Sequence, residues 1–164
     1  MIKLIKTTFY NEKETKKKLS KFIEEAEMLS FGPECNKFEH SFAKWQKRKH
    51  CIFLNSGSSA NLAIIQALLN LGKIKPGENV GFSAMTWSTN VMPLMQLGLT
   101  PIPTDIELDT LNILSVKLLE TLKKFPLKML FITNLLGFCD DIDRIREICD
   151  QKKILLIEDN SELS

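Results

Sequence analysis

The sequence is poor in the residues that build metal sites. It contains 4 cysteines and 2 histidines in 164 residues, and none of the cysteines forms a CxxC pair. Structural metal sites usually combine such pairs with further Cys or His ligands at short spacings. We therefore expect no bound metal, and thiols that stay reduced.

Long apolar runs are also missing. No uncharged apolar stretch reaches the roughly 20 residues that a membrane-spanning helix needs. Lys3 and Lys6 interrupt the segment after Met1, where a secretion signal would place its apolar core. The sequence therefore predicts a cytoplasmic protein without a membrane partner.

Charge of one sign is not in large excess, since the net charge is only +2. Residues 1–50 hold 12 Lys/Arg against 7 Asp/Glu, and residues 51–164 hold 10 against 13. The basic excess falls mostly on one expected helix, between residues 13 and 21, and no aromatic residues alternate with its lysines. A solvated helix face explains this pattern better than a nucleic-acid surface does.

Apolar periodicity predicts alternating strands and helices after residue 50. The pattern indicates strands at 51–54, 80–84, 100–104, 128–133 and 154–157. It indicates helices from 11 to about 29, 38–45, 57–71, 88–97 and 114–124, and one that Asp140 or Asp141 caps. Such alternation is typical of a mostly parallel, doubly wound α/β sheet. Pro101 and Pro103 should place the 100–104 strand at or near an edge. We expect two regions, a helical segment over 1–48 and the sheet region over 49–164.

One stretch, residues 53–63, passes from an apolar run through a small polar turn into a helix. Gly57 lets backbone approach a ligand closely, and Ser58 and Ser59 lie where a helix leaves its first N–H groups unpaired. The helix dipole favours an anion there, above all a phosphate. The alternative is that Ser58 or Ser59 is only an N-cap. The turn matches neither a P-loop nor a dinucleotide fingerprint.

Polar residues follow the other expected strands, and parallel strands end on one rim of the sheet. Asp159 follows four apolar residues and could bind a metal, cap the next helix or hold a protonated ring nitrogen. Trp87 precedes a helix and could be a core aromatic or a flat wall for a planar ligand. A helix N-terminus for a phosphate, an aromatic wall and a carboxylate together describe a site for pyridoxal 5'-phosphate.

Several blocks of sequence resemble one enzyme family. They are Phe38-Glu39-x-x-Phe42-Ala43, Asn-Ser-Gly-Ser-Ser-Ala-Asn at 55–61, Lys-Pro-Gly-Glu-Asn-Val at 75–80, Met-Thr-Trp-Ser-Thr-Asn at 85–90, Leu-Gly-Leu-Thr-Pro-Ile-Pro-Thr-Asp at 97–105, Asp-Thr-Leu-Asn-Ile at 109–113, Leu-Leu-Gly at 135–137 and Leu-Ile-Glu-Asp-Asn-Ser-Glu at 156–162. In order and spacing they resemble the N-terminal part of the DegT/DnrJ nucleotide-sugar aminotransferases, which are fold-type I pyridoxal phosphate enzymes. The resemblance implies the N-terminal portion of that fold's large domain, with an incomplete sheet and no C-terminal domain.

The resemblance also implies roles for individual residues. Ser58 and Ser59, with the backbone at Gly57, would hold the cofactor phosphate, and Trp87 would stack on the ring. Asp159 would face the ring nitrogen, and Glu162 would lie near the ring's phenolic oxygen. The implied substrates are a keto nucleotide sugar and an amino donor, for which the family indicates glutamate, and the implied assembly is a homodimer.

Two residues depart from the usual family pattern and leave the reaction open. Many members have Gln or His where this sequence has Glu162, and His where it has Asn134. The acidic pattern is similar to the branch that includes sugar 3-dehydratases, in which His replaces the cofactor-carrying lysine. In the family that lysine lies beyond the Glu-Asp block, whereas no lysine follows Lys153 here. We therefore expect no catalytic residue in these 164 residues and no transaminase activity from them alone. The hypotheses are an aminotransferase, a 3-dehydratase, and a non-catalytic fragment that binds a partner.

Overall fold

The computed structural model of the protein describes residues 9–139 and 141–161. Contacts within the chain divide it after Phe53 into two units, residues 1–53 and 54–164. The expected division into domains at residue 48 stays a prediction.

The described residues of the first unit, 9–53, contain two helices, α1 (Glu12–Glu25) and α2 (Pro33–Trp45). Asn11 precedes α1 in the left-handed conformation (φ 45°), and its side chain makes no cap hydrogen bond. The helix ends before Ala26, whereas the periodicity predicts that it continues to about Leu29. None of the α1 side chains is buried, so no packing holds the last expected turn in helical form. Pro33 begins α2, at the position where a missing N–H costs nothing.

The expected strand at residues 51–54 is wrong, because the structure shows no regular element there. The Phe53 N–H donates instead to Glu39 Oε1 at 2.8 Å. The Phe53 ring packs edge-on against Phe38, with ring centroids 5.3 Å apart, and against Phe31 at 6.5 Å. A short apolar run becomes a strand only where a neighbouring strand takes its backbone hydrogen bonds. Here the Glu39 side chain takes the Phe53 N–H, and rings of the same unit pack against the Phe53 ring.

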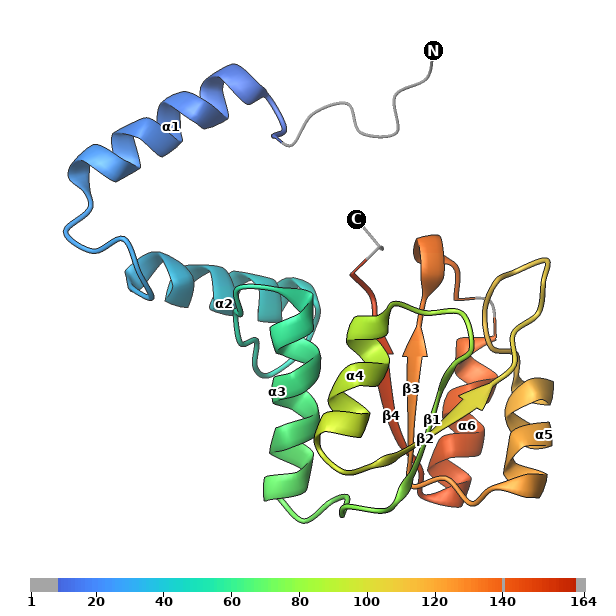
Figure 1. Cartoon of the computed structure of the whole chain (residues 1–164). Coiled ribbons are helices and arrows are strands. Elements are labelled where there is room, and N and C mark those ends of the chain that lie inside the picture. Colours follow the sequence, from blue (N-terminus) through green and yellow to red (C-terminus); the bar gives the residue numbers. More distant parts are fainter. Residues whose placement is uncertain (1–8, 140, 162–164) are drawn as a thin grey trace. The chain divides into compact units, whose positions relative to one another are not determined.

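The second unit is a parallel sheet with helices on both faces (Figure 1). Its elements are α3 (Gly57–Asn70), β1 (Asn79–Ser83), α4 (Ser88–Gln96), β2 (Thr100–Thr104), α5 (Ser115–Lys124), β3 (Met129–Thr133), the 3₁₀ turn η1 (Leu135–Gly137), α6 (Ile142–Lys152) and β4 (Leu155–Asp159). The strand order is β2-β1-β3-β4, and every pairing is parallel. The strand that contains Pro101 and Pro103 therefore lies at an edge, which confirms that prediction.

Each face of the sheet has its own apolar core. α3 and α4 cover one face, and α5 and α6 cover the other (Figure 1). All five residues of β3 are buried, and the four apolar ones alternate between the two cores. Met129 and Phe131 pack with the α3 and α4 side, whereas Leu130 and Ile132 pack with the α5 and α6 side. The predicted fold class, a doubly wound α/β sheet, is confirmed.

Parallel pairing brings the carboxyl ends of all four strands to one rim of the sheet. Ser83, Thr104 and Thr133 end their strands there, and all three are buried although they are polar. Asp159 ends β4 beside Thr133. Lys153 follows α6 just before β4 begins, so it lies at the end of the sheet where the strands start, opposite the rim. Within the described part of the chain, no helix is both long and apolar enough to cross a membrane.

Candidate cofactor site

The first turn of α3 is set by Ser56, not by Ser58 or Ser59. Ser56 is the N-cap, with extended backbone, and its Oγ accepts the Ser59 N–H at 3.1 Å. The alternative that Ser58 or Ser59 is only an N-cap is therefore wrong, because the helix begins earlier, at Gly57. The amides of Gly57 and Ser58 consequently lie in the first turn, where a helix has no carbonyl partners for them.

Space is open in front of this turn. A Cβ added at Gly57 would meet nothing within 4 Å. An open groove runs between α3 and α4, lined by Ser58, Ser59, Leu62, Ser88, Thr89, Met92, Pro93 and Gln96. The first turns of both helices therefore border the same groove, and both direct their positive ends toward the rim.

Trp87 is the N-cap residue of α4 and lies on the same rim. Its side chain is 60% exposed, so it is not a core aromatic. Its carbonyl oxygen accepts the Asn90 N–H at 3.0 Å, which fixes the backbone of Trp87 to the first turn of α4. Of the two interpretations of this residue, an exposed aromatic surface is the one that the structure favours.

The Asp159 carboxylate accepts hydrogen bonds from three directions. Oδ2 accepts from Asn90 Nδ2 at 2.8 Å and from Asn61 Nδ2 at 3.4 Å, and Oδ1 accepts from the Ser161 N–H at 3.0 Å. Burial by itself raises the pKa of Asp159. The hydrogen bonds from Ser161, Asn90 and Asn61 outweigh burial and hold the pKa below its ordinary value. This carboxylate is therefore ionised at neutral pH.

A chain of polar groups continues from Asp159 into the sheet. Asn90 Nδ2 also donates to Thr133 Oγ1 at 3.0 Å, and Thr133 Oγ1 shares a hydrogen bond with Thr86. The Thr133 N–H donates to Ser83 Oγ at 3.1 Å. The rim of β1, β3 and β4 is thus joined by side-chain hydrogen bonds, as buried polar groups require.

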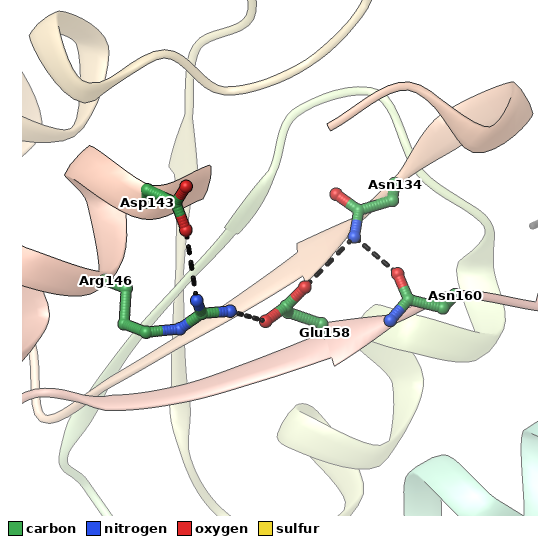
Figure 2. A network of polar contacts seen from close by, with 5 residues as sticks. All are labelled: Asn134, Asp143, Arg146, Glu158 and Asn160. Atoms are coloured by element: carbon green, nitrogen blue, oxygen red, sulfur yellow. Dashed lines mark hydrogen bonds and ion pairs between the residues drawn. The ribbon is translucent and has the colours of Figure 1, made fainter. Parts of the chain in front are cut away.

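Glu158, the neighbour of Asp159, belongs to a separate network that Figure 2 shows. Its Oε1 pairs with Arg146 Nη2 at 3.1 Å, and its Oε2 accepts from Asn134 Nδ2 at 3.3 Å. Asn134 also donates to Asn160, and Arg146 pairs with Asp143. Successive strand residues point to opposite faces, so Glu158 contacts α6 while Asp159 contacts α3 and α4. Of the two acids, only Asp159 lies with the first turns of α3 and α4.

The predicted cap of α6 is confirmed in position for Asp141 but not in its hydrogen bond, and Asp140 lies outside the described residues. Asp141 occupies the N-cap position of α6 but makes no cap bond there. Its Oδ2 instead accepts the N–H of Ser115, the first residue of α5, at 2.6 Å. The Asp141 side chain therefore accepts a first-turn N–H of α5, not of α6.

Sequence reasoning missed Asn61 and Asn90 as residues of this site. Both are buried on helices, at 9% and 2% exposure. Each ends one of the blocks that carry the family resemblance, and a polar amide on the apolar side of a helix was the available signal. Glu162, which the resemblance places near the ring's phenolic oxygen, lies outside the described residues.

Comparison with known proteins decides the family. A family model described as "DegT/DnrJ/EryC1/StrS aminotransferase family" matches residues 10–162. The chain belongs to this family. The match confirms the resemblance that the sequence blocks predict.

Members of the family with known activity include both reaction types. The chain is 37% identical over 142 residues to the GDP-4-keto-6-deoxy-D-mannose 3-dehydratase of Yersinia pseudotuberculosis, covering 85% of this chain and 36% of that protein. It is 28% identical over 131 residues to the UDP-4-amino-4-deoxy-L-arabinose–oxoglutarate aminotransferase of Shewanella sediminis, covering 80% of this chain and 32% of that protein. The chain thus spans about a third of the length of these relatives.

Solved structures of the DegT family share this fold. The structure of the E. coli GDP-4-keto-6-deoxy-D-mannose-3-dehydratase with bound hydrated PLP superimposes with a TM-score of 0.85 and 32% identity, covering 96% of this chain and 40% of that one. The expectation of pyridoxal phosphate is therefore confirmed at the level of the family.

The residues of this chain suit that cofactor chemically. An open first helical turn with unpaired amides can receive a phosphate. An ionised carboxylate on the same rim can pair with a protonated ring nitrogen, and an exposed indole can cover a planar ring. The structure provides these features at Gly57 and Ser58, at Asp159 and at Trp87.

Proposed function

We propose that the intact protein is a pyridoxal-phosphate-dependent enzyme that acts on a keto nucleotide sugar in polysaccharide biosynthesis, and that it works as a homodimer. The observation that carries this proposal is the Asp159 carboxylate. It is kept ionised by hydrogen bonds from two helices, and both helices begin at the rim where it lies. Three donors converge on this carboxylate, whereas a helix cap uses one acceptor oxygen. This supports a role for Asp159 beyond capping.

In this proposal each rim residue has one task. The amides of Gly57 and Ser58 and the hydroxyls of Ser58 and Ser59 bind the phosphate, and Gly57 lets the backbone come close to it. Trp87 covers one face of the ring and excludes water from it. Asp159 keeps a proton on the ring nitrogen, and Glu162 is assigned to the ring's phenolic oxygen. When bound, pyridoxal phosphate supplies a protonated ring that withdraws electrons from an attached amine.

Between the two reactions of the family, we favour removal of the sugar 3-hydroxyl. Relatives with this activity reach 37% and 35% identity, whereas the Shewanella aminotransferase reaches 28%. The acid at Glu162 supports the same choice. Transfer of an amino group from glutamate is the second candidate, and the family description supports it.

The products separate these two reactions. The intact protein is incubated with pyridoxal phosphate, ¹⁵N-labelled glutamate and GDP-4-keto-6-deoxy-D-mannose, and the sugar is analysed by mass spectrometry. Loss of the 3-hydroxyl without ¹⁵N in the sugar supports the dehydratase. A sugar that carries ¹⁵N supports the aminotransferase. If neither product forms with any keto nucleotide sugar, the proposed substrate class is wrong.

Asp159→Asn tests the cofactor assignment. This change removes the charge but keeps the shape, so the ring nitrogen should lose its proton. The reaction of bound cofactor with glutamate is measured by absorbance at saturating cofactor. We expect its rate to fall by about tenfold or more, which corresponds to a barrier higher by at least about 1.4 kcal/mol. Asn caps helices as well as Asp does, so a capping role would leave the rate within about twofold.

Asp105→Asn is the matched control. Asp105 also follows a strand at this rim, but its side chain is exposed. Its Oδ1 accepts the neighbouring Ile106 N–H at 3.0 Å, its Oδ2 pairs with Lys117 Nζ at 3.5 Å, and neither contact involves α3 or α4. The control should react at the parent rate. Equal losses in the two variants would show that the effect is not specific to the cofactor site.

A further inference from the structure

Asn90 is a buried residue whose hydrogen bonds reach three other parts of the rim. It lies in the first turn of α4 and is only 2% exposed. Its backbone N–H donates to the Trp87 carbonyl at 3.0 Å, and its Nδ2 donates to Asp159 Oδ2 at 2.8 Å and to Thr133 Oγ1 at 3.0 Å. One residue therefore contacts both groups that the proposed function assigns to the ring.

The orientation of the Asn90 amide follows from its partners. A carboxylate only accepts hydrogen bonds, so the amide must direct N–H toward Asp159. The other N–H meets the Thr133 hydroxyl, and the Asn90 oxygen accepts from Thr89 Oγ1 at 3.4 Å. A flipped amide would place an oxygen against the carboxylate. The surrounding groups thus allow one orientation of the Asn90 amide, and in that orientation the amide holds the Asp159 side chain in place.

The site is anchored from two further elements. Thr133 is paired with Asp159 across β3 and β4, so Asn90 bridges the ends of both strands. Asn61 reaches the same Asp159 oxygen from α3, but its longer distance of 3.4 Å makes it the weaker donor. Asn90 therefore sets where the carboxylate lies relative to α4 and Trp87.

We propose that Asn90 is a positioning residue that fixes the spacing and direction of Asp159 and Trp87 around the cofactor ring. This inference rests on the proposed function. Asn90 acts through Asp159 and Trp87, and the proposal assigns it no direct contact with the cofactor. Leucine at this position keeps the number and branching of the side-chain heavy atoms but removes both N–H donors.

The test compares Asn90→Leu with Asn112→Leu in the intact protein. Asn112 is equally buried, at 2% exposure, and its Nδ2 donates to the carbonyls of Thr110 and Phe138 at 3.1 and 2.7 Å. It is thus a buried amide with two hydrogen bonds but no connection to Asp159. Three quantities are measured for each variant. They are the Kd for pyridoxal phosphate, the pH titration of the bound cofactor's absorbance, and the thermal midpoint of the cofactor-free protein.

For Asn90→Leu we expect the Kd to rise by about tenfold or more and the absorbance titration to shift, because the ring nitrogen loses a well-placed carboxylate. For Asn112→Leu we expect a lower thermal midpoint with Kd and titration unchanged within about twofold. If Asn90→Leu also keeps the parent Kd and titration, Asn90 is only structural and the inference is overturned.

Two further outcomes are decisive. If Asn90→Leu does not fold, Asn90→Ser, which is smaller and keeps a hydroxyl, is measured in the same way, and failure of both to fold also overturns a positioning role. Binding by the parent protein tests the proposed function separately. A parent that binds no pyridoxal phosphate refutes both proposals, whereas a parent and an Asn90→Leu variant that bind equally refute only this one.

Discussion

The first turn of α3 offers a way to separate helix capping from phosphate binding, using two serines two residues apart. Ser56→Ala removes the side chain that accepts the Ser59 N–H at 3.1 Å. Ser58→Ala removes a hydroxyl that takes no part in this cap but borders the groove between α3 and α4. We expect the two variants to fail in different assays.

The structure sets the size of each effect. Loss of an N-cap hydroxyl costs about 1 kcal/mol of stability, within a range of about 0.5–2. Ser58 is an exposed residue inside the first turn, where alanine is a good helix former, so its change should stay within about 0.5 kcal/mol. A hydrogen bond to a charged phosphate contributes about 1.5–3 kcal/mol, which corresponds to a roughly 10- to 150-fold rise in Kd for Ser58→Ala.

Two measurements on the intact protein check this. Denaturant unfolding without cofactor reports stability, since bound cofactor would hide a loss by mass action. Equilibrium dialysis reports the Kd for pyridoxal phosphate. The reasoning is refuted if Ser58→Ala binds within about twofold of the parent, or if Ser56→Ala leaves the unfolding midpoint unchanged.

Two other predictions concern the core and the thiols. Gly81→Ala should lower the thermal midpoint by an amount equivalent to about 1–3 kcal/mol, because a Cβ there would lie 2.7 Å from Leu127 Cδ1. Gly57→Ala, which meets nothing within 4 Å, is the control, and equal midpoints would contradict the described packing. Burial raises the pKa of Cys149 to about 11, so its thiol stays protonated at pH 8 and should react with a thiol-specific disulfide reagent far more slowly than exposed Cys139. Equal labelling rates in the folded protein would show that Cys149 is not buried.

The sheet could be predicted from the sequence because its signals are local. Apolar runs of strand length alternate with helical periodicity, and this alternation alone indicates a parallel sheet. Pro101 and Pro103 carry no N–H for a ladder, so they identified the edge strand correctly. The rim followed from the same reasoning, since parallel strands end together.

The errors arose where a local pattern has more than one possible partner. The apolar run at 51–54 matches a strand, but Phe53 finds its contacts in Glu39 and two phenylalanine rings. Ser56, Ser58 and Ser59 are all suitable caps by type, and only the backbone conformation decides among them. Local sequence gives the candidates in each case, and the surrounding structure selects one.

The two asparagines of the site show the same limit at longer range. Asn90 and Asn61 lie 69 and 98 residues from Asp159 in the sequence, so no window of periodicity contains both a donor and its acceptor. Each is the polar exception on a helix that otherwise packs apolar side chains against the sheet. A buried amide is costly unless it finds a partner, and the partner available at this rim is a carboxylate. The family resemblance assigns Asp159 to the ring nitrogen, but only the fold shows that the two asparagines which hold it come from α3 and α4, the helices that border the groove.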